Sequence, residues 1–210
     1  MKFTTTLPSI FLVLISSACK DDDSKISVNL DEFEQITQPY PYTDVSTEEA
    51  IDYWELLSSS IPDPLFSAGT KCANSSNEGQ CIYDFNATIS ENIGFGINCP
   101  LDYCFKYIRY QSKDEISLVT STDDLIEFLG EINTKSDAIL LATAYSYYFS
   151  TTKKEIGAIK EVKDGYEILT TQLVKFCSPI QTNRFLLKVS RNGKIEILKQ
   201  EMYSTSNGCI

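Results

Sequence analysis

The chain has 210 residues, of which 29 are acidic and 18 basic, so its formal net charge is −11. This acidity argues against nucleic-acid binding and against electrostatic adsorption to anionic lipid, because both require basic surface. Histidine is absent, which excludes Ser-His-Asp and Cys-His catalysis within the chain and removes the commonest metal ligand. We therefore expect neither a metal ion nor a cofactor.

The first 18 residues have the features of a secretory signal peptide. Lys2 is followed by an apolar run, Leu7 to Ile15, and by Ser-Ser-Ala before Cys19. The run is too short for a transmembrane helix, which needs about 20 apolar residues. The ending resembles a lipobox, although Ser16 stands where leucine is usual. The resemblance implies that residues 1–18 are removed and that Cys19 carries a diacylglycerol anchor. An ordinary cleaved signal, with Cys19 as a free thiol or a disulfide partner, is the alternative.

An acidic run follows this cysteine: Lys20, Asp21, Asp22 and Asp23. It resembles the surface-export signal of lipoproteins from the Bacteroidota, which implies an outer-membrane, lipid-anchored protein exposed at the cell surface. A plain polar tether on a periplasm-facing protein is the alternative. Residues 19–45 are polar and contain two prolines, so we predict that they form the lipidated cysteine and a flexible acidic tether. Residues 46–210 are then expected to form a single globular domain.

Six further cysteines remain, an even number that predicts three disulfides in an oxidising compartment. Sequence alone does not choose their connectivity, but local pairing is expected: Cys72–Cys81, Cys99–Cys104 and Cys177–Cys209. Zinc binding is the alternative, although the chain has no Cys-x-x-Cys pair.

Hydrophobic periodicity predicts the first elements of the domain. Ser46 and Glu49 form a capping-box pattern before a helix expected at residues 47–58, with Trp54 on its apolar face as a core residue. Residues 67–80 are expected to be a loop. Alternation of apolar and polar residues predicts a strand at 81–89, and aromatic or β-branched residues predict strands at 104–111 and 115–120.

Two more helices are predicted in the middle of the chain. Ser121 with Asp124 begins the first, which Gly130 ends, and Thr134 with Asp137 begins the second. One face of the second helix contains Ala138, Leu141, Ala142, Tyr145 and Phe149. Tyr145, Tyr147 and Tyr148 form an aromatic cluster, interpreted either as core with a solvated rim or as a sugar-stacking or protein-binding surface.

The C-terminal third is predicted to be an antiparallel meander. Asp164-Gly165 is a turn between strands at 156–162 and 166–176. In the last hairpin, a three-residue loop from Arg191 to Gly193 gives a consistent register. It pairs Val189 with Ile195, Leu187 with Ile197, and Lys188 with Glu196.

Together these patterns predict an α+β fold, an antiparallel sheet with about three helices stapled by disulfides. The anchor and the missing histidine favour a non-catalytic binding or structural role in the cell envelope, with a protein or glycan as ligand. A carboxylate-based glycan hydrolase is the alternative, as is a periplasm-facing assembly partner. Ser150 and Lys153 match the Ser-x-x-Lys pair of acylating enzymes, but the Lys-Thr-Gly element of those enzymes is missing.

Overall fold

The computed structural model describes residues 25–96 and 104–209, which form a mixed α+β fold with two antiparallel sheets. Sheet A has the strand order β1 (Glu34–Gln35), β6 (Ala158–Val162), β7 (Gly165–Lys175), β8 (Ile180–Ser190) and β9 (Ile195–Ser206). Sheet B has the order β3 (Ile61–Gly69), β2 (Tyr53–Ser58), β4 (Lys106–Ser112) and β5 (Glu115–Val119). The described helices are α1 (Glu78–Ala87), α2 (Thr122–Leu129) and α3 (Lys135–Ala144), with short 3₁₀ turns at Leu30–Glu32 and Lys154–Ile156.

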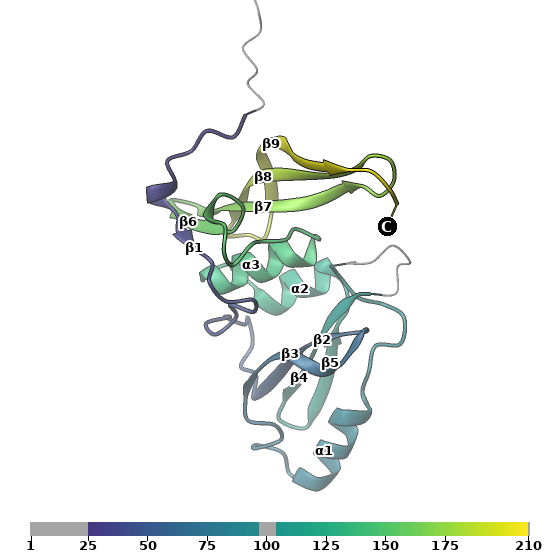
Figure 1. The fold of residues 1–210 in the computed structure, drawn as a ribbon. Helices are drawn as coiled ribbons and strands as arrows, with labels where there is room; N and C mark the ends of the chain where they lie inside the picture. Colours follow the sequence, from purple (N-terminus) through teal and green to yellow (C-terminus); the bar gives the residue numbers. More distant parts are fainter. Residues whose placement is uncertain (1–24, 97–103, 210) are drawn as a thin grey trace, which may run out of the picture.

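Helices α2 and α3 lie between the two sheets, and α1 lies at the end of the molecule remote from sheet A (Figure 1). Every residue of α3 except Lys135 is buried, because the helix has a sheet on either side. One hydrophobic cluster draws on both sheets, including Trp54 and Ile108 from sheet B and Ile168 and Leu187 from sheet A. No helix among residues 25–96 and 104–209 is long and apolar enough to cross a membrane.

The helix starts predicted at Ser121 and Thr134 are confirmed, and each forms a capping box. The side chains of Ser121 and Thr134 accept from the amides of Asp124 and Asp137, whose carboxylates accept in return from the cap residues. Gly130 ends α2 with a φ of +66°. The last hairpin also has the predicted register and three-residue loop, with Gly193 at a φ of +80° and the Ser190 amide donating to the Lys194 carbonyl over 2.9 Å.

Two predicted elements have the wrong type. Residues 53–58 form strand β2 instead of a helix. Because β2 is central in sheet B and is buried on both faces, its sequence lacks the alternation of a half-buried strand. Residues 81–89 fall mostly in α1 instead of a strand. Only Cys81 and Phe85 of α1 are buried, four residues apart as in a helix, whereas Tyr83 between them is 70% exposed.

The expected loop at residues 67–80 is also partly replaced, by the end of β3 and the start of α1. Strand β3 includes Pro62 and Pro64, which a strand at the edge of a sheet can accommodate. Asn77 caps α1 by accepting from the amide of Gln80 over 3.2 Å. Ser46 caps no helix, since its amide and hydroxyl both donate to the Asp137 carboxylate.

The segment from Ile26 to Ile36, here called the N-terminal strap, corrects the predicted tether. Ile26 and Phe33 are buried against Ala158, Leu169 and Leu186 on the face of sheet A opposite α3. The strap then adds β1 to the edge of β6. The chain is therefore part of the folded domain from Ile26 onward. The signal peptide, Cys19 and the acidic run at 20–23 lie outside the described residues.

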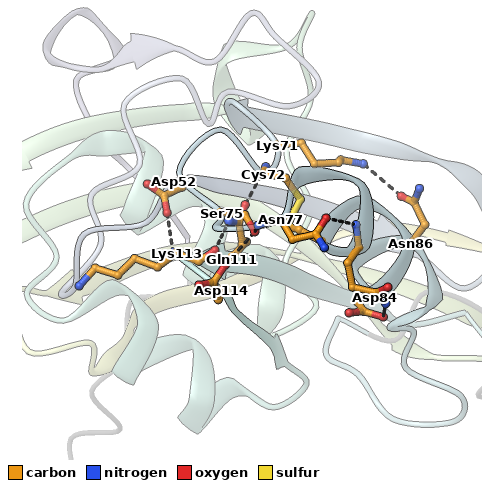
Figure 2. The surroundings of a disulfide bond; sticks show 12 residues. Asp52, Lys71, Cys72, Ser75, Asn77, Asp84, Asn86, Gln111, Lys113 and Asp114 are labelled. Carbon is orange, nitrogen blue, oxygen red and sulfur yellow. Dashed lines mark hydrogen bonds between the residues drawn. A yellow bond between two sulfur atoms is a disulfide. The ribbon is translucent and has the colours of Figure 1, made fainter.

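Two predicted disulfides are present, Cys72–Cys81 and Cys177–Cys209; Cys99 of the third expected pair lies outside the described residues. Cys72 joins the loop after β3 to α1 (Figure 2). The amide of Cys72 donates to the buried Gln111 side chain over 2.8 Å, and Ser75 donates to Asp114 over 2.7 Å. Loop, disulfide and β4–β5 turn are thus tied together.

We expect the double variant Cys72→Ser/Cys81→Ser to lose about 2–3 kcal/mol of unfolding free energy, because the short loop is no longer closed in the unfolded chain. Urea unfolding without reductant measures the loss. Ala73→Ser, which adds a hydroxyl to the same exposed loop and keeps the disulfide, is the control. An unchanged midpoint in the double variant would contradict the expectation.

Candidate functional site

A cavity of about 450 Å³ lies where the segment after α3 meets the segment before β2. We call it the tyrosine pocket. Its lining consists of Pro39, Tyr40, Tyr42, Lys106, Thr143 and the run from Tyr147 to Thr151. The volume falls within the range of small-ligand sites, which are typically apolar clefts with a few placed polar groups.

The end of α3 turns two of the three predicted binding tyrosines into this pocket. Ser146 has a φ of +63°, and the Tyr147 amide donates back to the carbonyl of Ala142 over 3.1 Å. Tyr148 then pairs with Thr171 of β7 through two backbone hydrogen bonds of 2.8 and 2.7 Å. Tyr145 is 39% exposed and does not line the pocket. The predicted cluster is therefore split.

The tyrosines of the pocket differ in burial, and their burial determines which of them a ligand can contact. Tyr42 is only 2% exposed, and burial raises its pKa to about 12. Burial also raises the pKa of Tyr147 and of Tyr148, so all three hydroxyls stay neutral at physiological pH. Tyr147 packs edge-on against Phe185 at 5.3 Å between ring centroids. Tyr40, 36% exposed, and the half-buried Tyr148 are thus the rings that a ligand reaches first.

Lys106 is the cation of the pocket, and the sequence analysis missed it. It lies at the start of β4, is 9% exposed, and burial lowers the pKa of its ammonium group. The adjoining Gly96 donates its amide to the carbonyl of Ala144 over 3.0 Å, and a Cβ there would come within 2.9 Å of the Thr143 carbonyl oxygen. A lysine within a predicted strand is expected to be exposed, so the sequence did not indicate that Lys106 is buried.

The residues of the Ser-x-x-Lys match form a turn at the rim of the pocket. The Ser150 hydroxyl accepts from the amides of Thr152 and Lys153 over 3.2 and 3.0 Å. The Lys153 amine lies 3.3 Å from the Tyr203 hydroxyl. Lys153 is therefore engaged with β9, and the pair has no nucleophile–base geometry.

A second polar cluster lies between sheet B and α1. Glu55, 2% exposed, accepts from Arg109 over 2.7 Å, from Lys71 over 2.8 Å and from the Tyr53 hydroxyl over 2.7 Å. Arg109 also donates to the carbonyl of Thr88 over 2.8 Å, and its guanidinium lies 4.4 Å from the centroid of the Phe85 ring. The cluster fastens α1 to sheet B, and no pattern in the sequence predicted it.

A glycan hydrolase requires a pair of carboxylates, and one cleft in the described part of the chain brings several carboxylates together. A cleft of about 300 Å³ is lined by Glu48, Glu49, Asp124 and Glu127, but Asp124 is occupied as the capping residue of α2. Hydrogen bonds lower the pKa of Asp52, Asp114 and Asp124. Burial by itself would raise the pKa of Glu55, but hydrogen bonds from Lys71, Arg109 and Tyr53 hold it below its usual value. The general acid of a glycosidase needs the opposite shift.

These lowered pKa values predict acid sensitivity. A carboxyl whose folded pKa is depressed stabilises the protein fully above its ordinary value, 4.5 for Glu55 and 3.8 for Asp124, and loses that contribution as the pH falls through the folded value. We expect unfolding free energies from urea titrations to be level above about pH 5 and to fall below it. Asp124→Asn, which cannot titrate, should show a shallower fall, and an equal fall would contradict the assignment.

In comparisons with protein-family models, curated proteins and solved structures, nothing matches this chain. Within residues 25–96 and 104–209, no group of three or more cysteine, aspartate or glutamate side chains is placed to hold a metal ion. The fold and the site thus define a disulfide-linked α+β protein with two antiparallel sheets and an aromatic pocket.

Proposed function

We propose that the chain is an exported, surface-exposed lipoprotein, anchored through Cys19, whose domain binds a saccharide in the tyrosine pocket without catalysis. The observation that carries the binding role is the convergence of Tyr40, Tyr42, Tyr147 and Tyr148 on one cavity of about 450 Å³. The more accessible rings, Tyr40 and Tyr148, offer flat apolar faces with polar tips, which complement the C–H faces and hydroxyls of a sugar ring. The Ser150 and Thr151 side chains at the rim add hydroxyls.

The size of the pocket favours a short glycan segment over a protein partner. A stable protein interface buries about 800 Å² on each side and is broad, whereas this cavity is small and concave. Among the described residues lining the pocket there is no carboxylate. The site can therefore contact a bound sugar, but it has no pair of carboxylates for acid–base hydrolysis.

Binding is tested by screening the detergent-extracted mature protein on an array of bacterial and host oligosaccharides and measuring affinities by calorimetry. We expect Tyr148→Ala to weaken binding by about 2- to 12-fold, the equivalent of roughly 0.5–1.5 kcal/mol for a lost aromatic contact. Tyr145→Ala removes a neighbouring tyrosine outside the pocket and should bind as the parent does. Equal effects of the two variants, or no saccharide bound, would overturn the proposed site.

The anchor and its location are tested separately, by intact mass and by protease shaving of whole cells. A mature chain that starts at a diacylated Cys19 and is digested by external protease is expected. An unlipidated soluble chain would overturn the anchor. A lipidated chain that resists shaving would place the protein on the periplasmic side and favour the assembly-partner alternative.

A further inference from the structure

The N-terminal strap determines which part of the domain lies nearest to the lipid on Cys19. The Ile26 amide donates to the Glu201 carboxylate of β9 over 3.1 Å, and Glu201 is paired with Arg184 of β8 at 2.9 Å. Phe33 is buried farther along the same face of sheet A, with Lys160 stacked 4.9 Å from its ring centroid. The chain therefore leaves the domain from the face of sheet A opposite α3, here called the back face.

Few residues separate this point from the anchor. Ile26 is seven residues after Cys19, and a chain spans at most about 3.6 Å per residue, so the strap begins no farther than about 25 Å from the lipidated cysteine whatever the conformation between them. Helix α1 and sheet B lie at the opposite end of the molecule from β1 and the rest of sheet A (Figure 1). The bilayer is thus within reach of sheet A and remote from α1.

Charge divides the protein along the same line. Residues 153–210, which supply β6 to β9, hold ten basic and six acidic side chains, a net +4, and the strap with Lys25 contributes −2. Residues 37–152, which supply sheet B and the helices, hold five basic and 17 acidic side chains, a net −12. The net charge of the whole chain conceals this asymmetry. Residues 20–23 add a further −2, and on the back face Lys160 and Arg184 are paired with Glu167 and Glu201, so sheet A and the N-terminal segment are together neutral. An anionic surface therefore repels the second part and leaves the first largely unaffected, within roughly the 8–10 Å over which salt leaves such forces unscreened.

We propose that the back face of sheet A is a membrane-facing surface that lies on anionic lipid headgroups, so that sheet B and α1 point away from the bilayer. The inference rests on the proposed anchor at Cys19. The short link alone would allow the domain to tumble about its attachment, and the charge asymmetry selects one orientation. The acidic half, with the Cys72–Cys81 disulfide, is then the part presented to the surroundings.

The test uses the lipidated full-length mature chain in vesicles of phosphatidylcholine with phosphatidylglycerol and an acceptor-labelled lipid. A donor fluorophore on a non-canonical amino acid replaces Ser204, three residues from Glu201 on β9, or Tyr83 on α1; both positions are exposed. We expect energy transfer to the bilayer to be several-fold stronger from position 204. Lys199→Glu should reduce this difference, and so should high salt. The control Lys113→Glu, the same charge change on the β4–β5 turn, should not.

Equal transfer from the two positions in vesicles that carry the protein would overturn the orientation while leaving the anchor intact. A difference that persists unchanged in pure phosphatidylcholine would overturn the role of the anionic headgroups. A chain that fails to float with the vesicles would overturn the anchor, and with it the inference. The failures of the two proposals are therefore distinct.

Discussion

Glu55→Leu is expected to lower the free energy of unfolding by about 3–5 kcal/mol, because it leaves the buried Arg109 guanidinium without its carboxylate. Glu55 is 2% exposed and Arg109 6%, so water cannot replace the lost partner. Lys71 is the more exposed of the two cations that contact Glu55, with 28% of its side chain accessible, and can turn to solvent. The change in unfolding free energy is measured by urea unfolding, followed through the fluorescence of Trp54, which precedes Glu55 in β2.

The double variant Glu55→Leu/Arg109→Met is the matched control. It removes both charges and keeps the apolar volume, and replacing a buried pair in this way is often close to neutral. We expect it to be substantially more stable than Glu55→Leu alone. A single variant that loses less than about 1 kcal/mol would indicate that Arg109 finds water or another partner, and that the cluster does not hold α1 to sheet B.

Phe33→Ala is expected to cost about 3–5 kcal/mol, the usual loss for removing a buried phenylalanine. Phe33 is 4% exposed and fills the small cluster between the strap and sheet A. The same substitution should make residues 26–36 susceptible to limited proteolysis, because the strap then loses the largest side chain that it buries against sheet A and keeps only smaller apolar contacts, its polar contacts and the short β1 pairing.

The control is Phe176→Ala, which removes an identical side chain that is 53% exposed near the end of β7. It should change the unfolding free energy by less than about 0.5 kcal/mol, as exposed substitutions usually do. If Phe33→Ala were equally mild, the strap would contribute little to stability. Residues 26–36 would then behave as the flexible tether that the sequence predicted, which would also remove the geometric basis for the membrane orientation.

The sequence by itself determined the features that depend on neighbours along the chain. The capping boxes at Ser121 and Thr134 form because a side chain and an amide three residues apart meet at the first turn of a helix. The last hairpin has the predicted register because a three-residue loop and the pairing of Val189 with Ile195 agree. The Cys72–Cys81 disulfide likewise closes a loop of short sequence separation.

Only the tertiary structure decided the features that depend on distant partners. Residues 53–58 form a strand because β3 and β4 flank them and supply their hydrogen bonds, which overrides the helical spacing of their apolar side chains. Phe33 is buried because Leu169 and Leu186, more than 130 residues away, provide a surface for it. Tyr42, Lys106 and Tyr148 meet in one pocket because α3 packs between two sheets. Contacts made across such separations leave no local period or spacing in the sequence, so composition and pattern could suggest binding tyrosines but not the cavity that unites them.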